Sequence, residues 1–344
     1  MKAARLYEFG QPMVVEEIPD LSPNPGEVIV KIAGCGFCHS DVHFIAGELP
    51  IAPAMPITLG HENAGYVAKI GEGVSQYKEG DPVVVFGGWG CRTCDICSTS
   101  AEQLCGDAHW VGLSDGADGG YAEYLRVPTE QYLIPLKDNL DPKVAAAYTD
   151  AALTPYRAIR KALPFLTPGS KVLTIGMGAL GQYGIKLLKL MTACEIIAVD
   201  ISDHKLAIAK RYGADYLINS NDPDIIEQIL NLTHGTGVSG AFDFVGLDST
   251  LALAIASTAS LGKVSQVGLG GGSANFKVME NSRFEVTYES ILWGTVKELR
   301  DVMTLAENGQ LTPIELEYAP LEHINEVYQR VKTGQVEGRI IITP

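Results

Sequence analysis

From Lys171 onward the chain repeats one rhythm of strand, glycine-rich turn and helix. Its predicted strands are KVLTIG, EIIAVD, YLIN, AFDFVG, KVSQVG (263–268) and FEVTY (284–288). Its predicted helices are Leu180–Met191, one that begins at His204 and one that follows Pro223. Alternating β and α segments of this length fold as a parallel sheet covered by helices. The sequence therefore predicts a Rossmann-like α/β domain with six strands in this part of the chain.

The chain on either side of this region has a different pattern. The first 135 residues contain short apolar runs broken by Gly and Pro, and the predicted strands are GEVIVKI (26–32), AGYVAKI, DPVVVF and YAEYLRV. A helix-like stretch follows Asp141, in which Pro155 is expected to start, kink or end a helix. The tail predicts helices near 295–308 and 320–333 and a closing strand, RIIIT. This order suggests that the α/β domain is inserted into a β-rich domain.

Composition excludes several classes of protein. The 344 residues are enough for two domains, and 46% hydrophobic with 19% charged residues exclude an intrinsically disordered chain. No apolar run reaches the roughly 18 residues of a membrane helix, and the start MKAARLYEFG lacks the apolar core of a signal peptide. A net charge of −15 without a run of Lys and Arg disfavours nucleic acid as a partner. We expect a cytoplasmic chain that does not associate with membranes.

Four of the seven cysteines have the spacing of a metal site. Cys91, Cys94, Cys97 and Cys105 form C-x2-C-x2-C-x7-C within a lobe of about residues 88–108. Four thiolates favour a tetrahedral Zn²⁺ with no open position, which stabilises a lobe and takes no part in chemistry. The alternatives are ordinary thiols and an iron–sulfur cluster, although the Cys-Pro that usually follows such a motif is missing. The odd number of cysteines and their spacing favour metal ligands in a reducing compartment over disulfides.

A second group of metal-binding residue types is scattered along the chain. The strings GFCHSDVH (36–43) and GHE (60–62) carry a thiolate, imidazoles and carboxylates, and Asp150 is the only acid in an Ala-rich stretch. A buried carboxylate needs a compensating charge, which Zn²⁺ would supply. Cys38, His61 and Asp150 would then give three ligands and leave the fourth position for water or substrate. The alternative is a small buried thiol, a core histidine and a helix N-cap, respectively.

A glycine-rich turn follows the first strand of the predicted α/β domain. Gly176, Gly178 and Gly181 form G-x-G-x-x-G before a helix, and Asp200 ends the next strand 19 residues after the last glycine. Such glycines let a pyrophosphate approach the amides at the helix N-terminus. A carboxylate at Asp200 can bind the ribose hydroxyls of NAD and repels the 2′-phosphate of NADP. The sequence therefore favours NAD, and the alternative is a tight turn without a ligand.

These three features, in this order, resemble the zinc-dependent alcohol dehydrogenases of the medium-chain dehydrogenase/reductase family, of the bacterial secondary-alcohol type. The strings that match family motifs are GFCHSDVH, LGHENAGYV, the four-cysteine cluster, TDAALTPY, GMGALG with Asp200, and GRIII. The resemblance covers essentially the whole chain. It implies a GroES-like catalytic domain, residues 1–151 and 289–344, into which an NAD-binding Rossmann domain, residues 152–288, is inserted. It also implies a homotetramer.

The resemblance assigns roles at the metal site. Cys38, His61 and Asp150 match the ligands of a catalytic zinc, although many relatives have Cys at the third position. The other matching residues are Ser40, a hydroxyl that relays the alcohol proton; His43, which passes it to solvent through the cofactor ribose; Asp41, which orients His61; and Glu62, close to the zinc. With the four-cysteine site, two zinc ions per chain are implied.

The resemblance also assigns cofactor contacts. They are Gly176, Gly178 and Gly181 in the turn, Asp200 and Lys205 at the adenosine ribose, His39 and Arg339 at the pyrophosphate, and Thr154 at the nicotinamide. Separately, the apolar side chains Phe86, Trp110, Leu269 and Trp293 are candidates for a substrate pocket, and each is equally compatible with the core.

The implied reaction is reversible hydride transfer between a primary or secondary alcohol and NAD, giving an aldehyde or ketone. Zn²⁺ lowers the pKa of a bound hydroxyl by many units, as it lowers that of bound water to about 7, and hydride loss then becomes possible at neutral pH. Two alternatives are a polyol dehydrogenase of the same family and a non-catalytic protein that binds NAD or zinc. A zinc-ribbon protein that binds nucleic acid is a third, disfavoured by the charge of −15.

Overall fold

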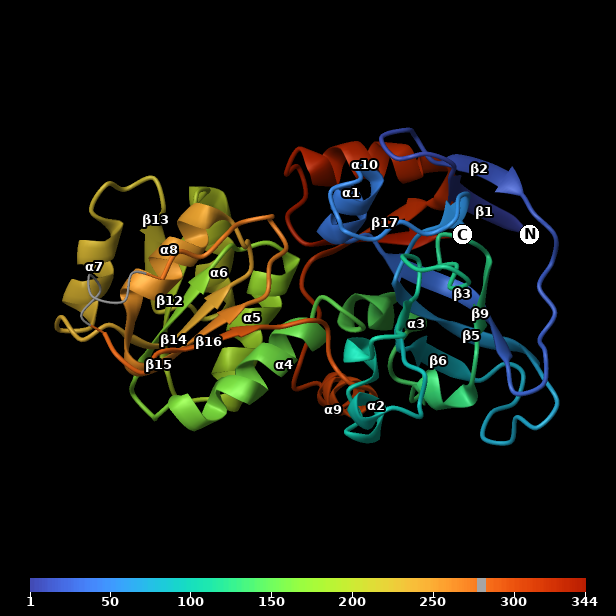
Figure 1. Ribbon diagram of the computed structural model, residues 1–344, viewed down its shortest axis with the longest axis horizontal. Coiled ribbons are helices and arrows are strands. Elements are labelled where there is room, and N and C mark those ends of the chain that lie inside the picture. Colours follow the sequence, from blue (N-terminus) through green and yellow to red (C-terminus); the bar gives the residue numbers. More distant parts are fainter. Residues whose placement is uncertain (277–282) are drawn as a thin grey trace. The chain divides into compact units, whose positions relative to one another are not determined.

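The computed structural model describes residues 1–276 and 283–344 and divides into two compact units. The first unit contains both ends of the chain, Met1–Leu153 and Trp293–Pro344, and the second is the middle, Thr154–Leu292. In Figure 1 the first unit therefore carries the blue and red ends of the colour scale, and the second the green to orange part.

The second unit is built on a six-stranded parallel sheet in the order β13-β12-β11-β14-β15-β16. The strands are β11 (Lys171–Ile175), β12 (Glu195–Asp200), β13 (Tyr216–Asn219), β14 (Val238–Asp243), β15 (Thr258–Gln266) and β16 (Thr287–Ser290). The predicted parallel sheet is thus confirmed. Its last strand starts three residues later than predicted, because Glu285 has a φ of 60° and interrupts the extended run before Thr287.

Five helices accompany this sheet in the part of the second unit that the structure describes. They are α4 (Leu153–Ala162), α5 (Ala179–Met191), α6 (Asp203–Tyr212), α7 (Ile225–Leu232) and α8 (Asp248–Ser257). Pro155 lies in the first turn of α4, where its missing N–H leaves no hydrogen bond unmade, so it starts the helix rather than breaking it. The helix α8 was not predicted, because its run of small and apolar residues has no clear polar face. Buried aliphatic side chains from the sheet, α7 and α8 form the core of this unit.

The first unit is mainly antiparallel. Its largest sheet runs in the order β10-β6-β5-β3-β18-β17, and β9 also pairs with β3. These strands are β3 (Val28–Gly36), β5 (Glu62–Ile70), β6 (Pro82–Val85), β9 (Tyr124–Val127), β10 (Leu133–Pro135), β17 (Leu316–Pro320) and β18 (Arg339–Thr343). The smaller sheets contain β1 (Lys2–Leu6), β2 (Val14–Glu17) and β4 (Ile57–Thr58), and β7 (Gly88–Trp89) with β8 (His109–Trp110). All four predicted strands and the closing strand are present.

The closing strand carries the end of the chain to the middle of this sheet. Strand β18 pairs with β3, with Ile342 opposite Cys35 and Ile341 opposite Gly36. The helices of the unit are α1 (His39–Ile45), α2 (Asp95–Ser98), α3 (Pro142–Ala145), α9 (Val296–Glu307) and α10 (Ile324–Lys332). The two helices predicted in the tail are therefore confirmed. The pairing of β18 with β3 places Arg339 in the same sheet as the strand that leads to Cys38.

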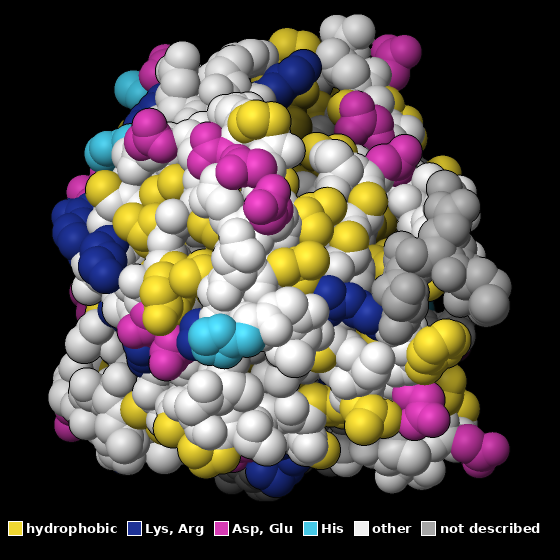
Figure 2. Space-filling view, turned by 90° about the vertical axis from the view of Figure 1, so that its left-hand side faces the viewer, with side chains coloured by type: hydrophobic (Ala, Val, Ile, Leu, Met, Phe, Trp, Pro, Cys, Tyr) yellow, Lys and Arg dark blue, Asp and Glu magenta, His cyan; other side chains and the backbone are white. Residues whose placement is uncertain are grey.

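Charged and apolar side chains are mixed on the surface of the second unit. Figure 2 views the molecule from the end at which α7 lies, and its Lys and Arg side chains are interspersed with acidic and hydrophobic ones. Among the described residues, no helix combines the length and the apolar character that crossing a membrane requires.

Candidate functional site

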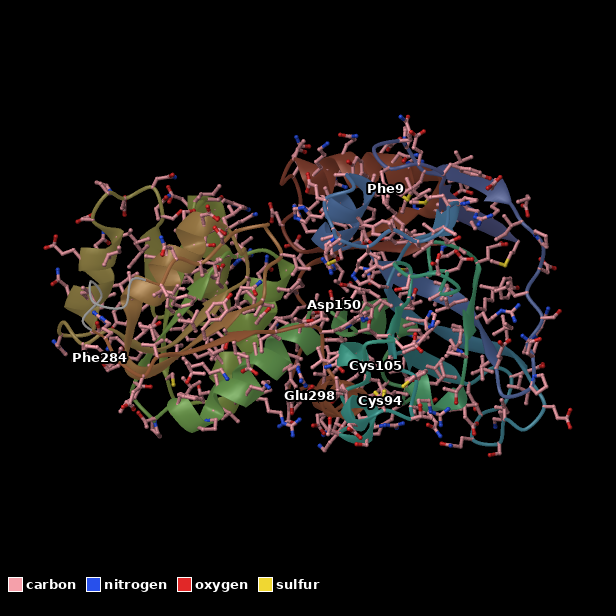
Figure 3. The ribbon with its side chains drawn as sticks, in the orientation of Figure 1. Phe9, Cys94, Cys105, Asp150, Phe284 and Glu298 are labelled. Carbon is pink, nitrogen blue, oxygen red and sulfur yellow. The ribbon has the colours of Figure 1, made fainter. Side chains whose placement is uncertain are left out.

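The four cysteines of the lobe converge on one point. Their four Sγ atoms all lie within 4.8 Å of one another. The Sγ atoms of Cys91 and Cys97 are 4.0 Å apart, and those of Cys94 and Cys105 are 3.7 Å apart. The Cys97 amide donates to Cys94 Sγ at 3.5 Å, because Cys94 is the N-cap of α2. Cys94 and Cys105 lie side by side in Figure 3, and Asp150 lies above them in the same view.

The surroundings of these sulfurs lower the pKa of one thiol and raise the pKa of another. The Thr93 hydroxyl donates to Cys91 Sγ at 3.5 Å and, with nearby backbone amides, lowers the pKa of Cys91 to about 6. Burial raises the pKa of Cys97 to about 12. A thiol with such a raised pKa beside three other sulfurs is stabilised as a thiolate only when a cation compensates the charge. The donor set fits a closed tetrahedral zinc site.

A second cluster forms where three distant segments of the first unit meet. Cys38 precedes α1, His61 precedes β5, and Asp150 follows the short helical turns after α3. The Cys38 Sγ and His61 Nε2 atoms lie 3.6 Å and 3.7 Å from Asp150 Oδ2. One ligand atom each from these residues and Glu62 lies within 4.8 Å of the others. Folding thus brings together the three predicted ligands.

Glu62 is held by an arginine that the sequence did not pair with it. Arg339 Nε donates to Glu62 Oε2 at 2.9 Å, and the second guanidinium nitrogen donates to Oε1, so the pair is bidentate. Burial raises the pKa of Glu62 to about 7, although Arg339 opposes this shift. The guanidinium also lies 3.9 Å from Asp150 Oδ2. Arg339 therefore neutralises one carboxylate of the cluster and lies close to the other.

His61 is oriented from behind by Asp41. Asp41 Oδ1 lies 3.3 Å from His61 Nδ1, which leaves Nε2 facing Cys38 and Asp150. Burial lowers the pKa of His61, but Asp41, Asp150 and Cys38 together outweigh burial, and the pKa lies well above its usual value. Asp41 is fully buried and its Oδ2 accepts hydrogen bonds from the Cys38 amide at 2.9 Å and the Tyr121 hydroxyl at 2.7 Å.

This cluster fits a metal ion with an open position. A thiol, an imidazole nitrogen and a carboxylate oxygen are donors that Zn²⁺ accepts, and they converge in a buried place. Glu62 is occupied by Arg339, so three donors remain for the ion. The side chain of Asp150 is 13% exposed, whereas those of His61 and Glu62 are 4% and 0% exposed. Access to the cluster is therefore from the side of Asp150.

The residues assigned to proton relay lie on α1. Ser40 Oγ is 3.3 Å from His61 Nε2, so its hydroxyl faces the cluster. His43 Nδ1 is 2.6 Å from Glu48 Oε2, and its ring lies 5.2 Å from that of the exposed His39. Among the described residues, no hydrogen bond joins Ser40 to His43. The structure thus brings Ser40 to the cluster and places His43 nearer to solvent.

One of the four candidate pocket residues, Trp293, lies at the cluster, and Phe86 packs against it. The Trp293 ring is 5.6 Å from the His61 ring and 6.2 Å from the Phe86 ring, and its Nε1 donates to Thr149 O at 3.0 Å. Trp110 instead donates its indole N–H to Gln103 O at 3.1 Å, near the cysteine lobe. The fourth candidate, Leu269, is 45% exposed and belongs to the second unit.

The glycine turn of the second unit has the geometry of a phosphate-binding loop. Gly176 has a φ of 88°, and a Cβ at Gly181 would lie 1.9 Å from Gly176 O, so both positions require glycine. A Cβ at Gly178, the N-cap of α5, would meet no atom within 4 Å, which leaves space above the helix N-terminus. Asp200 is 8% exposed, and its Oδ2 accepts from the Met177 amide at 2.6 Å.

The two remaining candidates for cofactor contacts also belong to the second unit. Thr154 is buried in the first turn of α4, and Lys205 lies in the first turn of α6, where its amide donates to Ser202 Oγ at 3.4 Å. Lys205 thus lies on the helix that follows Asp200 directly.

The second unit is a Rossmann fold, and the first contains one closed and one open cluster of metal-ligating residues. This combination defines a metal-dependent dehydrogenase. Residues 24–138 match the GroES-like domain of alcohol dehydrogenases, and residues 179–308 match the zinc-binding dehydrogenase domain. The NAD-dependent alcohol dehydrogenase of Sulfurisphaera tokodaii is 35% identical over 100% of both chains. The chain therefore belongs to the zinc-dependent alcohol dehydrogenases of the medium-chain dehydrogenase/reductase family.

Two further proteins bear on function. The crystal structure of the alcohol dehydrogenase from Aeropyrum pernix superimposes with a TM-score of 0.93, at 35% identity and full coverage of both chains. The D-arabinose 1-dehydrogenase (NADP(+)) of Saccharolobus solfataricus is 33% identical over 100% of this chain and 97% of its own. Relatives of similar identity are thus named for different substrates and different cofactors.

The sequence did not predict the contacts that two residues make at this site, Arg339 and Tyr121. The string GRIII marked Arg339 only as a cofactor contact, although one buried cation was to be expected near two buried carboxylates. Tyr121 lies in a run that we interpreted only as a strand, and nothing in its spacing connects it with Asp41.

Proposed function

We propose that this protein is a zinc- and NAD-dependent alcohol dehydrogenase that interconverts primary or secondary alcohols with aldehydes or ketones. The observation that carries the proposal is the convergence of Cys38, His61 and Asp150 within a buried cluster that stays accessible at Asp150. In this proposal the first unit is the catalytic domain and the second binds the cofactor.

Cys38, His61 and Asp150 would hold the catalytic zinc, and Arg339 binds both carboxylate oxygens of Glu62. When bound, zinc supplies a Lewis acid that lowers the pKa of the alcohol hydroxyl and polarises the carbonyl in the reverse direction. The Asp41 carboxylate fixes the His61 ring so that Nε2, and not Nδ1, points into the cluster.

Ser40 and His43 would remove the proton. Ser40 Oγ faces the cluster and can accept the proton of the alcohol hydroxyl while donating its own onward. His43, which is paired with Glu48 Oε2 at 2.6 Å and partly exposed, can receive a proton near solvent. In this role Ser40 takes the proton at the cluster and His43 holds it near solvent.

The second unit would bind NAD rather than NADP. Asp200 is held at the turn by the Met177 and Ser202 amides, and each carboxylate oxygen keeps a lone pair for a ribose hydroxyl. A 2′-phosphate would meet the same negative charge and be repelled. We further propose contacts to the cofactor from His39, Thr154, Lys205 and Arg339.

The substrate would be an apolar alcohol. The Trp293 ring packs beside the His61 ring, and the Phe86 ring packs against Trp293, so an apolar side chain lies next to the cluster. The second candidate is a polyol or sugar dehydrogenase, which the similarity to a D-arabinose 1-dehydrogenase favours. A panel of substrates separates the two: the proposal expects NADH to form with propan-2-ol or longer alcohols, and turnover restricted to sorbitol or sugars would overturn it.

Three finer properties belong to the same proposal. They are two zinc ions per chain, a homotetramer and a cytoplasmic location. Light scattering coupled to gel filtration tests the second, since a tetramer of a 36.8 kDa chain differs clearly in mass from a dimer.

A further inference from the structure

Tyr121 is rigidly placed beside the open metal cluster. Its side chain is fully buried, and its ring stacks on that of Phe37 with centroids 5.4 Å apart and planes 10° apart. Its backbone is bound on both sides, since its amide donates to Leu59 O at 2.9 Å and its carbonyl accepts from the Ala4 amide at 2.8 Å. The phenol hydroxyl therefore has one position available to it.

That hydroxyl donates a hydrogen bond to the carboxylate behind His61. Tyr121 Oη lies 2.7 Å from Asp41 Oδ2 and 3.4 Å from Gly36 O. The same Oδ2 accepts from the Cys38 amide, and the other oxygen, Oδ1, faces His61 Nδ1 at 3.3 Å. Two donors on Oδ2 fix the rotation of the carboxylate, and this fixes the direction of Oδ1.

The ring of Tyr121 also leaves no space for a side chain at Gly60, the residue before His61. A Cβ at Gly60, which has a φ of 100°, would lie 2.7 Å from Tyr121 Cδ1. Tyr121 thus contacts the residue that precedes His61 and the carboxylate that orients its ring. Both contacts act on the same imidazole.

We propose that Tyr121 is a positioning residue of the open metal site. Its hydroxyl holds Asp41 so that Oδ1 stays behind His61 Nδ1, which keeps the imidazole turned with Nε2 directed at the metal. This inference rests on the proposed function, because it requires that His61 bind a metal ion. Partners that orient a ligating histidine typically contribute a factor of about 10 to 100 in metal affinity.

The test compares Tyr121→Phe with Tyr77→Phe, which removes another buried phenol hydroxyl. Tyr77 is 8% exposed, and its Oη donates to Leu133 O at 2.8 Å, outside both metal clusters. Zinc bound to the folded protein is titrated with a competing chelator, and the two sites are followed separately. We expect Tyr121→Phe to weaken zinc at the open site about 10-fold and to leave the four-cysteine site unchanged. Tyr77→Phe should change neither.

A double-mutant cycle shows whether the effect passes through Asp41. In an Asp41→Asn background, Tyr121→Phe should add less than about 2-fold to the loss of zinc affinity, since coupled residues are not additive. Equal weakening at both sites, or no weakening at the open one, would overturn the inference. Additive effects of the two substitutions would also overturn it. A wild-type protein that binds zinc only through its four cysteines would instead contradict the proposed function itself.

Discussion

The two donor clusters of the first unit differ in how the chain supplies them. Cys91, Cys94, Cys97 and Cys105 lie within one short lobe, so local spacing alone can assemble four sulfurs. Cys38, His61 and Asp150 are spread over more than a hundred residues and meet only in the folded unit. The first cluster uses all four positions of a tetrahedral ion, and the second leaves one open.

The two clusters also differ in the charge of the groups that surround them. The four-cysteine cluster receives neutral donors, such as the Thr93 hydroxyl and the Cys97 amide. The open cluster is surrounded by buried ionisable groups, among them Asp41, Glu62 and Arg339. A site that has only to hold an ion needs little around it, whereas one that has to react keeps its ligands oriented and one position free.

The largest expected effect is on activity, from the loss of an open-site ligand. Cys38→Ala should lower kcat at least about 1,000-fold, because a bound metal contributes several kcal/mol and each 1.36 kcal/mol is a factor of ten. Zinc analysis should then find one ion per chain. The control is Cys35→Ala, since burial raises the pKa of Cys35 well above its usual value and keeps it a thiol. If Cys38→Ala kept a kcat within 10-fold of the wild-type value, the open cluster would not be the catalytic one.

The next effect is on stability, from the closed cluster. Cys94→Ser should lower the free energy of unfolding by at least about 4 kcal/mol, because a structural metal is lost. Molecules that remain folded should keep the open-site zinc and an unchanged KM. Cys194→Ser, which removes a buried thiol in the second unit, serves as the control. An unfolding temperature for Cys94→Ser equal to that of Cys194→Ser would contradict a structural role.

The third effect concerns the charge pair that only the open cluster has. Glu62→Gln should cost about 3–5 kcal/mol of stability, because it leaves the buried Arg339 without its partner. The matched control is Glu317→Gln, which breaks the half-exposed pair with Arg330 at 2.6 Å and should cost less than about 1 kcal/mol. Chemical denaturation of both variants measures the difference. Equal costs would show that the buried pair has no special importance.

The smallest expected effect is a difference in alkylation rate between two cysteines of the closed cluster. In zinc-free protein at pH 7.5, Cys91 should be a thiolate, because its pKa is lowered to about 6, and Cys97 a thiol, because its pKa is raised to about 12. Iodoacetamide should therefore modify Cys91 at least about 10-fold faster. The rate at Cys91 should fall only as the pH drops through about 6. Mass spectrometry of the peptides measures both rates, and faster modification of Cys97 would contradict the assignment.

The same contrast explains what the sequence could predict. The parallel sheet follows from alternating apolar strands and helices, and the four-cysteine cluster from spacing alone, because both signals are local. For the open cluster the residue types suggested metal ligands, but spacing could not show that Cys38, His61 and Asp150 meet. The family resemblance supplied that step, and the coordinates show the convergence.

Other features depend on tertiary contacts that leave no pattern in the chain. The pair of Arg339 with Glu62 joins residues 277 positions apart, and it exists because β18 lies beside β3. The hydrogen bond from Tyr121 to Asp41 spans 80 positions. Strand β16 was placed too early because FEVTY alternates apolar and polar residues along its whole length, and only the backbone of Glu285 shows where pairing begins.

Anomalous diffraction at the zinc edge from crystals of the zinc-loaded protein would locate every bound zinc ion. We expect two peaks per chain, one among the four cysteines and one within about 2.0–2.3 Å of Cys38 Sγ, His61 Nε2 and an Asp150 oxygen. A single peak at the four cysteines, in protein that reduces NAD with an alcohol, would contradict this expectation.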